Sequence, residues 1–169
     1  NVALREGRSA DVGLIIAEEH GGSGAGPVEL ELIMEEAGAA LLCAPLLASS
    51  VIAAALLAAI DDPPVAARYL PRLADGTSIA TAALTGLTGT WTPEGVAVLG
   101  TAPVAAGAPW TLHGTASFVL HAQNADLLLV AAHGPEGLSL FAVDLPQESV
   151  VVTPLPTFDR TLRLAQVVA

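Results

Sequence analysis

The histidines and the cysteine of this 169-residue sequence, which could bind a metal or take part in nucleophilic catalysis, are few and lie far apart. The four histidines show none of the short spacings at which metal ligands recur, and no serine or cysteine is paired with one of them as an activated nucleophile would be. These histidines are His20, His113, His121 and His133. We therefore predict no metal site, and the residues by themselves indicate no catalytic centre.

The single cysteine, Cys43, excludes an internal disulfide and a cysteine-rich zinc site. It flanks an apolar run, so we expect an inert thiol in the core of a protein from a reducing compartment. Four glutamates lie close together without a histidine among them, which favours the solvated face of a helix over a metal site. They are Glu29, Glu31, Glu35 and Glu36.

A loop with four glycines spans residues 18–26, EEHGGSGAG. Loops rich in glycine can bind phosphate through backbone N–H groups, but this one lacks a following GK[ST] and the GxGxxG spacing, and two carboxylates precede it. We interpret it as a turn that leads into a helix.

Composition excludes several function classes. The net charge is −11, with 17 acidic side chains against six arginines, and this balance repels nucleic acids and anionic membranes. The apolar fraction of 53% is ample for a core. The apolar run 44–60 is short, rich in alanine and interrupted by proline and serine, so we expect a buried helix rather than a membrane span. No signal peptide is expected, and we predict a cytoplasmic protein.

The first part of the sequence has helical periodicity. Pro27 suits the first turn of a helix whose apolar residues follow at helical spacing up to Leu41. A second, largely apolar helix is expected over 46–60, and a third over 65–74 that must bend or restart at Pro71. We place a domain boundary near Gly76, which gives an α-helical domain at 1–76 and a β-domain at 77–169.

The second part is rich in threonine, valine and glycine and lacks helical spacing. Short apolar runs separated by glycine and proline predict strands. The expected strands are 79–84, 95–98, a hairpin over 110–120 that turns at His113-Gly114, 126–131, 138–143, 150–153 and 162–168. The fold class is therefore α+β, with the helical domain followed by a mostly antiparallel β-barrel or sandwich.

Five segments in this order resemble the acyl-CoA dehydrogenase family, over nearly the whole sequence. They are EEHGGSGAGPVELELIMEEAG, YLPRLADG, ATAALTGLTGTWTPEG, WTLHGTASFVLHAQNADLLLVAA and PLPTFDRTLRLAQV. The resemblance covers the family's N-terminal helical domain and its middle β-domain, and no segment corresponds to its C-terminal helical domain. The segments with FVL and PLPTFDRTLRLA are similar to members that act on lipid and steroid side chains.

The resemblance implies an FAD-dependent oxidoreductase that introduces an α,β double bond into an acyl-CoA thioester. It also implies a homo- or hetero-oligomer, as a dimer or tetramer. In the family a carboxylate of the C-terminal domain removes the α-proton, so we name no catalytic residue in this sequence. Two alternatives stay open: a non-catalytic partner subunit of a heteromeric acyl-CoA dehydrogenase, and a related acyl-CoA oxidase.

The flavin-binding positions implied by the resemblance fall on two segments. In the segment 84–91, Thr85 matches the residue that approaches the flavin ring, and Trp91 stands in place of a serine that helps to hold the pyrophosphate. In the central strand, Phe118 matches the aromatic residue that lies against the isoalloxazine, and Leu120 matches the Ser or Thr whose hydroxyl bonds flavin N5. The complete set is Leu84, Thr85, Trp91, Phe118, Val119 and Leu120.

Three positions depart from the family pattern: Gly86-Leu87 replaces the usual Glu-Pro, and Trp91 and Leu120 replace hydroxyl residues. Each change removes a polar contact of about 0.5–1.5 kcal/mol, and these losses motivate the partner-subunit alternative. Phe118 as a plain core aromatic and Thr85 as a hydroxyl at a strand end without a ligand also stay open. Trp91 and Trp110 are candidates for ordinary walls of an acyl pocket.

Overall fold

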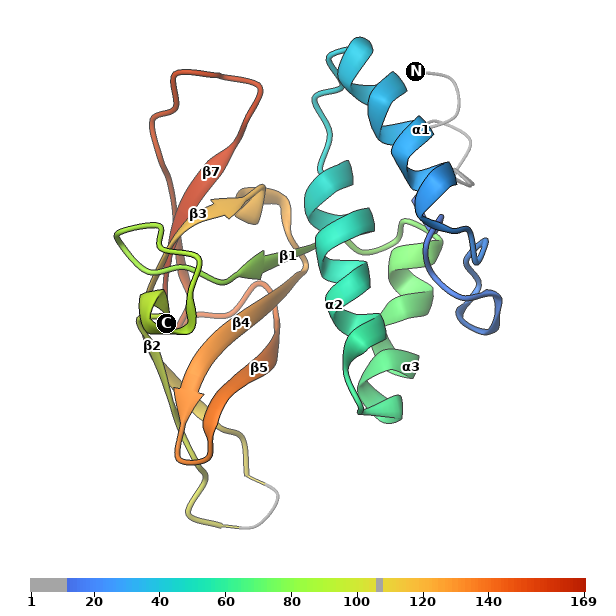
Figure 1. The fold of residues 1–169 in the computed structure, drawn as a ribbon. Coiled ribbons are helices and arrows are strands. Elements are labelled where there is room, and N and C mark those ends of the chain that lie inside the picture. The colour runs from blue at the N-terminus through green and yellow to red at the C-terminus, as the bar shows by residue number, and fades with distance from the viewer. Residues whose placement is uncertain (1–11, 106–107) are drawn as a thin grey trace. The chain divides into compact units, whose positions relative to one another are not determined.

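The computed structural model describes residues 12–105 and 108–169. The chain divides into two compact units, Asn1–Ala80 and Thr81–Ala169. The predicted boundary near Gly76, between 1–76 and 77–169, stays a prediction, because compactness does not show that each part folds on its own. The first unit is helical and the second is built from strands (Figure 1).

The helical unit contains a short 3₁₀ turn followed by helices. They are η2 (Glu18–His20), α1 (Pro27–Ala39), η3 (Leu46–Ala53), α2 (Ala54–Ala59) and α3 (Pro63–Ala74). The glycine-rich segment forms the turn expected before α1: Gly21 has a left-handed backbone with φ 83°. Pro27 opens α1, and the Gly26 N–H donates to the Glu29 carboxylate at 3.0 Å. A proline and a capping acid therefore fix where the helix begins.

The predicted second helix begins as a π-helix, η3, and continues as α2. The wider π turn is uncommon and often marks a functional or strained segment. Ser49 is buried on η3, and its Oγ accepts a hydrogen bond from the Ala80 N–H at 3.0 Å. A serine in an apolar helix is thus tolerated because its hydroxyl satisfies a buried backbone donor.

Helix α3 is amphipathic, and Asp62 caps it by accepting from the Val65 N–H at 3.1 Å. Of the two alternatives expected at Pro71, a restart does not occur, because the helix continues through this proline to Ala74, and the bend stays a prediction. Pro71 lacks the N–H that would donate to the carbonyl of residue 67, so the helix continues with one backbone hydrogen bond fewer.

The prediction of a buried Cys43 was wrong, since this thiol is exposed. It lies in the segment between α1 and η3, where Leu41 and Leu42 are exposed as well. Helix α1 has no buried residue, so an apolar run at this place does not become core. None of the described helices is long and apolar enough to cross a membrane.

The described residues from Ala80 to Ala169 form seven strands and two 3₁₀ turns, and the first strand begins at the last residue of the helical unit. They are β1 (Ala80–Ala83), η4 (Pro93–Gly95), β2 (Val98–Thr101), β3 (Thr111–Leu120), η5 (Ala122–Asn124), β4 (Leu127–Gly134), β5 (Gly137–Asp144), β6 (Val151–Pro154) and β7 (Leu164–Val168). The strand order is β1-β4-β2-β3-β7-β6, with β5 paired to β4. Most pairs are antiparallel, and β2 runs parallel to β4. The predicted α+β class is confirmed, with an open sheet rather than a closed barrel.

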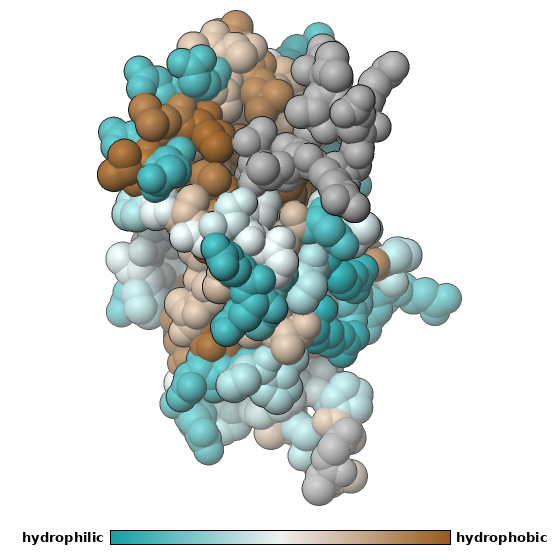
Figure 2. Space-filling view, turned by 90° about the vertical axis from the view of Figure 1, so that its right-hand side faces the viewer, coloured by the Kyte–Doolittle hydropathy of each residue, from teal (hydrophilic) through white to brown (hydrophobic). Residues whose placement is uncertain are grey.

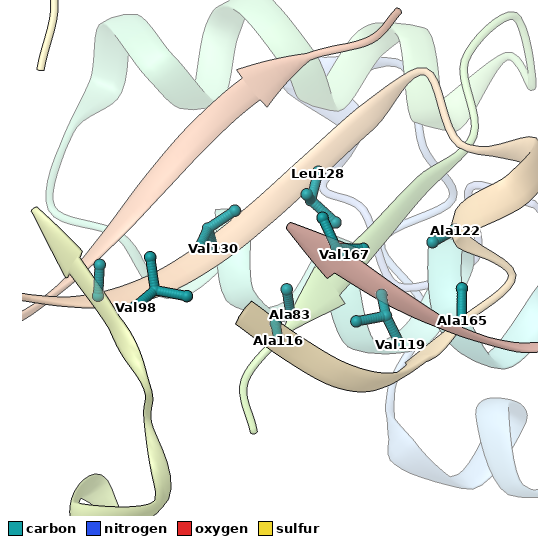
Figure 3. Packing of buried hydrophobic residues seen from close by; sticks show 10 residues of the cluster. Ala83, Val98, Ala116, Val119, Ala122, Leu128, Val130, Ala165 and Val167 are labelled. Atoms are coloured by element: carbon teal, nitrogen blue, oxygen red, sulfur yellow. The ribbon is translucent and has the colours of Figure 1, made fainter. Parts of the chain in front are cut away.

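The core of the β unit lies between these strands (Figure 3). Strand β4 contributes the most residues, Leu128, Val130 and Ala132, although all six residues from Leu127 to Ala132 are buried. The cluster comprises Ala83, Val98, Ala116, Val119, Ala122, Leu128, Val130, Ala132, Ala165 and Val167. Small residues dominate, so the backbones approach closely and there is little space for larger side chains.

The predicted hairpin turn at His113-Gly114 was wrong. Strand β3 continues through both residues from Thr111 to Leu120. Gly114 has φ 148°, and a Cβ added to it would lie 2.4 Å from the carbonyl oxygen of Ala97. Glycine is therefore required here because the segment that leads into β2 passes very close to β3. In the sequence, a glycine needed for such a close approach looks the same as a glycine needed for a turn.

Candidate functional site

A bulge in β3 is the most unusual backbone feature of the β unit. Ala116 pairs with Val167 and Val119 pairs with Ala165, so two residues of β3, Ser117 and Phe118, stand opposite the single residue Gln166 of β7. One extra residue bends a strand and redirects its side chains. Ala116 and Val119 both face the core as a result, and the residues between them do not follow the alternation of a regular strand.

The backbone of Ser117 is not paired with β7 and instead forms hydrogen bonds with Thr85, which lies just after β1. The Ser117 N–H donates to the Thr85 carbonyl oxygen at 3.0 Å, and Thr85 Oγ1 donates to the Ser117 carbonyl oxygen at 2.8 Å. Thr85 is only 5% exposed. Its hydroxyl therefore satisfies a buried carbonyl that the bulge has removed from the ladder.

Phe118 has a left-handed backbone, with φ 60°. This conformation costs a bulky residue about 1–3 kcal/mol and is found where surrounding contacts enforce it, often at functional sites. The side chain is 46% exposed. One edge of its ring lies against Gly89, where an added Cβ would be 3.0 Å from Phe118 Cε2. The bulge thus presents an aromatic ring to solvent beside a loop that has no side chain at the point of contact.

The structure brings only part of the predicted site together. Thr85 and Phe118 are linked through Ser117, whereas Trp91 is 75% exposed. Val119 is buried in the core, so it can contribute only backbone atoms. Leu84 and Leu120 are half-buried, and the Leu120 carbonyl oxygen accepts a hydrogen bond from the Thr81 hydroxyl.

Sequence reasoning did not identify three residues of this cluster. Ser117 ties the bulge to Thr85, Gln166 Nε2 donates to Ser117 Oγ at 3.3 Å, and Gly89 accommodates the aromatic ring. The left-handed φ of 67° at Gly89 is consistent with the requirement for glycine. The TGLTGT loop contains the only signal for Gly89. Nothing in the sequence pattern indicates the contact between Gln166 and Ser117.

His121, directly after β3, is the buried histidine of this unit, with a left-handed φ of 53°. Burial, and to a smaller extent the positive charge of Arg163, hold the pKa of His121 below its ordinary value. Among the described residues no group of three or more His, Cys, Asp or Glu could hold a metal ion.

The helical unit contains a cavity of about 790 Å³ next to α1. Its lining is mostly apolar and includes Leu32, Ile33, Leu42 and Leu46. The polar side chains Glu36, Cys43, Ser49, Ser50 and Ser78 also border it. In Figure 2, apolar surface gathers near the top of the view, at the level where the C-terminal end of α1 lies in Figure 1. The helical unit thus offers an open, mainly apolar hollow.

The comparisons with known proteins agree with this architecture. Residues 10–77 match the model of the acyl-CoA dehydrogenase N-terminal domain. No curated protein sequence matches significantly.

Among solved structures, the ChsE4-ChsE5 complex from Mycobacterium tuberculosis is 26% identical, with a TM-score of 0.84 over 99% of this chain and 43% of that chain. A variant of the Tcur3481-Tcur3483 steroid ACAD is also 26% identical, with a TM-score of 0.80 over 95% of this chain and 43% of that one.

A glutaryl-CoA dehydrogenase from Mycobacterium smegmatis in complex with FADH2 has the same fold, at 20% identity and a TM-score of 0.82. The match covers 99% of this chain and 43% of that one, so the present chain spans less than half the length of these structures. The expected resemblance is confirmed: residues 10–77 match the acyl-CoA dehydrogenase N-terminal domain, and the chain has the fold that these solved acyl-CoA dehydrogenases share.

Proposed function

We propose that this chain is an FAD-dependent acyl-CoA dehydrogenase, or a subunit of one, that introduces an α,β double bond into an acyl-CoA thioester. The observation that supports this most is the exposed ring of Phe118, held on a strained bulge beside Gly89. An apolar ring that a fold keeps exposed at a backbone cost is typical of a binding surface. The acyl-CoA dehydrogenases among the similar structures support the reaction class.

The residues present fit a flavin ring in part. Phe118 offers a flat, apolar surface on which a tricyclic ring can stack. In the segment 85–90, Gly89 has no side chain where it contacts the Phe118 ring, whereas Gly86 is buried against Gly95 and Ala97. The Thr85 hydroxyl already donates to Ser117, and Leu120 has no side-chain donor. Polar contacts to a flavin would therefore come from backbone groups of this chain.

When bound, FAD supplies the acceptor for the hydride that leaves the β-carbon. In this proposal Phe118 orients the ring and excludes water from one of its faces, while the Thr85–Ser117 pair keeps the bulge in place. We assign no carboxylate of this chain as the base. That group would come from a segment or subunit outside this sequence.

We assign the cavity of the helical unit to the apolar part of the acyl group. Its volume of about 790 Å³ lies within the usual range for small-molecule sites, about 300–1,000 Å³. Leu32, Ile33 and Leu46 provide apolar lining. The acidic Glu36 at the border disfavours a second carboxylate on the substrate. Acyl groups of lipid or steroid origin fit this chemistry better than dicarboxylic ones.

The proposal is tested by adding acyl-CoA thioesters under anaerobic conditions to protein loaded with FAD. Bleaching of the flavin bands, with formation of the enoyl-CoA, is the expected result. A protein that takes up no FAD would contradict the proposal. Rapid peroxide formation in air would instead indicate an acyl-CoA oxidase.

A non-catalytic partner subunit is the second candidate. The side chains at three positions favour it: the Thr85 hydroxyl is engaged inside the fold, Trp91 is exposed, and Leu120 lacks a donor. The similarity to the ChsE4-ChsE5 complex is consistent with a heteromer. Co-expression with the neighbouring gene product decides between the two: turnover by this chain alone would exclude the second candidate, and turnover only in the pair, with flavin bound by the partner, would favour it.

We also propose that the protein is cytoplasmic and forms a homo- or hetero-oligomer, a dimer or tetramer. The single cysteine, exposed at Cys43, suits a reducing compartment. The proposal of an oligomer rests on the exposed apolar residues of the helical unit, because such surface is usually covered in an assembly. They include Val28, Leu32, Leu41, Leu42 and Leu47. Sedimentation of the protein measures its oligomeric state.

A further inference from the structure

We propose that Gln166 and Ser117 are positioning residues that set the direction of the Phe118 ring. The inference rests on the proposed function only for its effect on flavin binding. Gln166 is the one residue of β7 that faces the two bulged residues of β3. Its Nε2 donates to Ser117 Oγ at 3.3 Å, so the strand opposite the bulge holds the bulge by a side chain where the backbone ladder is interrupted.

Ser117 is held from two sides. On one side Gln166 binds its hydroxyl, and on the other Thr85 exchanges two hydrogen bonds with its backbone. Ser117 itself is buried. A residue fixed at its side chain, its N–H and its carbonyl has little freedom to rotate. The following φ, that of Phe118, is therefore set by partners on two other segments.

The direction of Phe118 follows from this arrangement. Its left-handed φ of 60° is unfavourable for an aromatic residue and needs support from its surroundings. If Ser117 were released, the bulge could move to a neighbouring residue, and the ring would leave Gly89. The contact with Gly89, where an added Cβ would be 3.0 Å from the ring, is thus a measure of the position of Phe118.

The test uses three variants: Gln166→Leu, Ser117→Ala and the double variant. Leucine keeps much of the volume of glutamine but cannot donate a hydrogen bond. Gln123→Leu is the matched control, because Gln123 also donates to β7, to the Leu164 carbonyl at 3.1 Å, without touching the bulge. Tryptophan fluorescence of Trp91 and Trp110 checks that each variant has folded.

The first measurement is the NMR shift of the Gly89 α-protons in protein without flavin, with Phe118→Leu as the reference that lacks the ring current. Gln166→Leu and Ser117→Ala are expected to move this shift towards the reference value, and the Gln123 control is expected to leave it unchanged. An unchanged Gly89 shift in both variants would overturn the proposal. This result does not depend on flavin binding, so it is distinct from a failure of the proposed function.

The second measurement is the FAD dissociation constant, together with the shape of the visible flavin band. Each single variant is expected to weaken FAD binding about three- to tenfold, the usual size of one neutral hydrogen bond. The double variant should bind FAD no more weakly than the more affected single variant, since each single substitution already removes the same hydrogen bond. Independent, multiplying effects, or an unchanged flavin band, would also overturn the proposal.

Discussion

Helix α1 and strand β4 are both rich in apolar residues, but only one of them is buried. Every residue from Leu127 to Ala132 in β4 is inaccessible, whereas α1 has no buried residue and exposes Val28 and Leu32. Strand β4 is paired with neighbours on either side within one sheet. The apolar surface of α1 borders a cavity. An apolar sequence therefore marks a core in one unit and an open surface in the other, and only the packing partners distinguish the two cases.

The largest expected difference between the two regions is in the free energy of unfolding when one leucine in each is replaced by alanine. Leu128→Ala removes a fully buried side chain from the β core and is expected to cost about 2–5 kcal/mol of unfolding free energy. Leu32→Ala on α1 is expected to change it by less than about 0.5 kcal/mol. Urea unfolding followed by tryptophan fluorescence reports the β unit, which holds both tryptophans, and circular dichroism at 222 nm reports the helices. Equal losses would remove the contrast.

Two glycines extend the comparison. Gly114→Ala in β3 would bring a methyl group to 2.4 Å from a backbone oxygen at a left-handed φ, and should destabilise the β unit by about 2–4 kcal/mol. Gly38→Ala in α1 meets nothing within 4 Å and should stabilise the helix by about 0.5–1 kcal/mol. The same two spectroscopic probes measure both. If alanine at position 114 left the stability unchanged, this would contradict the close approach of β3 to the segment at Ala97.

A smaller effect tests the bulge. Thr85→Val keeps the shape of the side chain but leaves the buried Ser117 carbonyl without its donor, at an expected cost of about 1–3 kcal/mol. Thr88→Val is the control, because its hydroxyl contacts only the exposed Thr90 hydroxyl at 2.9 Å. Thermal unfolding monitored by tryptophan fluorescence compares the two. Equal melting temperatures in both variants would show that the Thr85 bond does not hold the bulge.

The smallest expected effect depends on pH. Because burial lowers the pKa of His121 in the folded state, the unfolded chain binds the proton more readily. The stability that neutral His121 provides is complete above about pH 6.5, the ordinary histidine pKa, and declines as the pH falls below it. His121→Asn, which tolerates the left-handed backbone, should flatten this decline. Urea midpoints at about pH 7.5 and about pH 5.5 measure it, and an unchanged slope would contradict the assignment.

Much of the fold was predictable because local patterns agree with the final packing. Pro27 and the helical spacing after it located α1, and the apolar run after Asp126 located β4. The turn predicted at Gly114 was wrong. Glycine suits a tight turn and a close approach of two strands equally well, and only the position of the neighbouring segment at Ala97 distinguishes the two cases. Cys43 was predicted to be buried because sequence shows hydrophobicity but not whether a partner covers it.

The candidate site was predictable to a smaller extent. Resemblance to a family pointed to Thr85 and Phe118, and the structure links them through Ser117. Gln166 could not have been found, because its role depends on the register between β3 and β7, which a single sequence does not encode locally.

The exposed ring of Phe118 is the central element of the proposed flavin site, and a titration with FAD tests it most directly. Phe118→Ala is expected to weaken FAD binding at least tenfold, because about one aromatic stack of 0.5–1.5 kcal/mol and the apolar area beneath it are lost together. Leu99→Ala, also exposed on the same sheet, should leave FAD binding unchanged. Equal affinities for the two variants, or no FAD binding by the unmodified protein, would contradict the account.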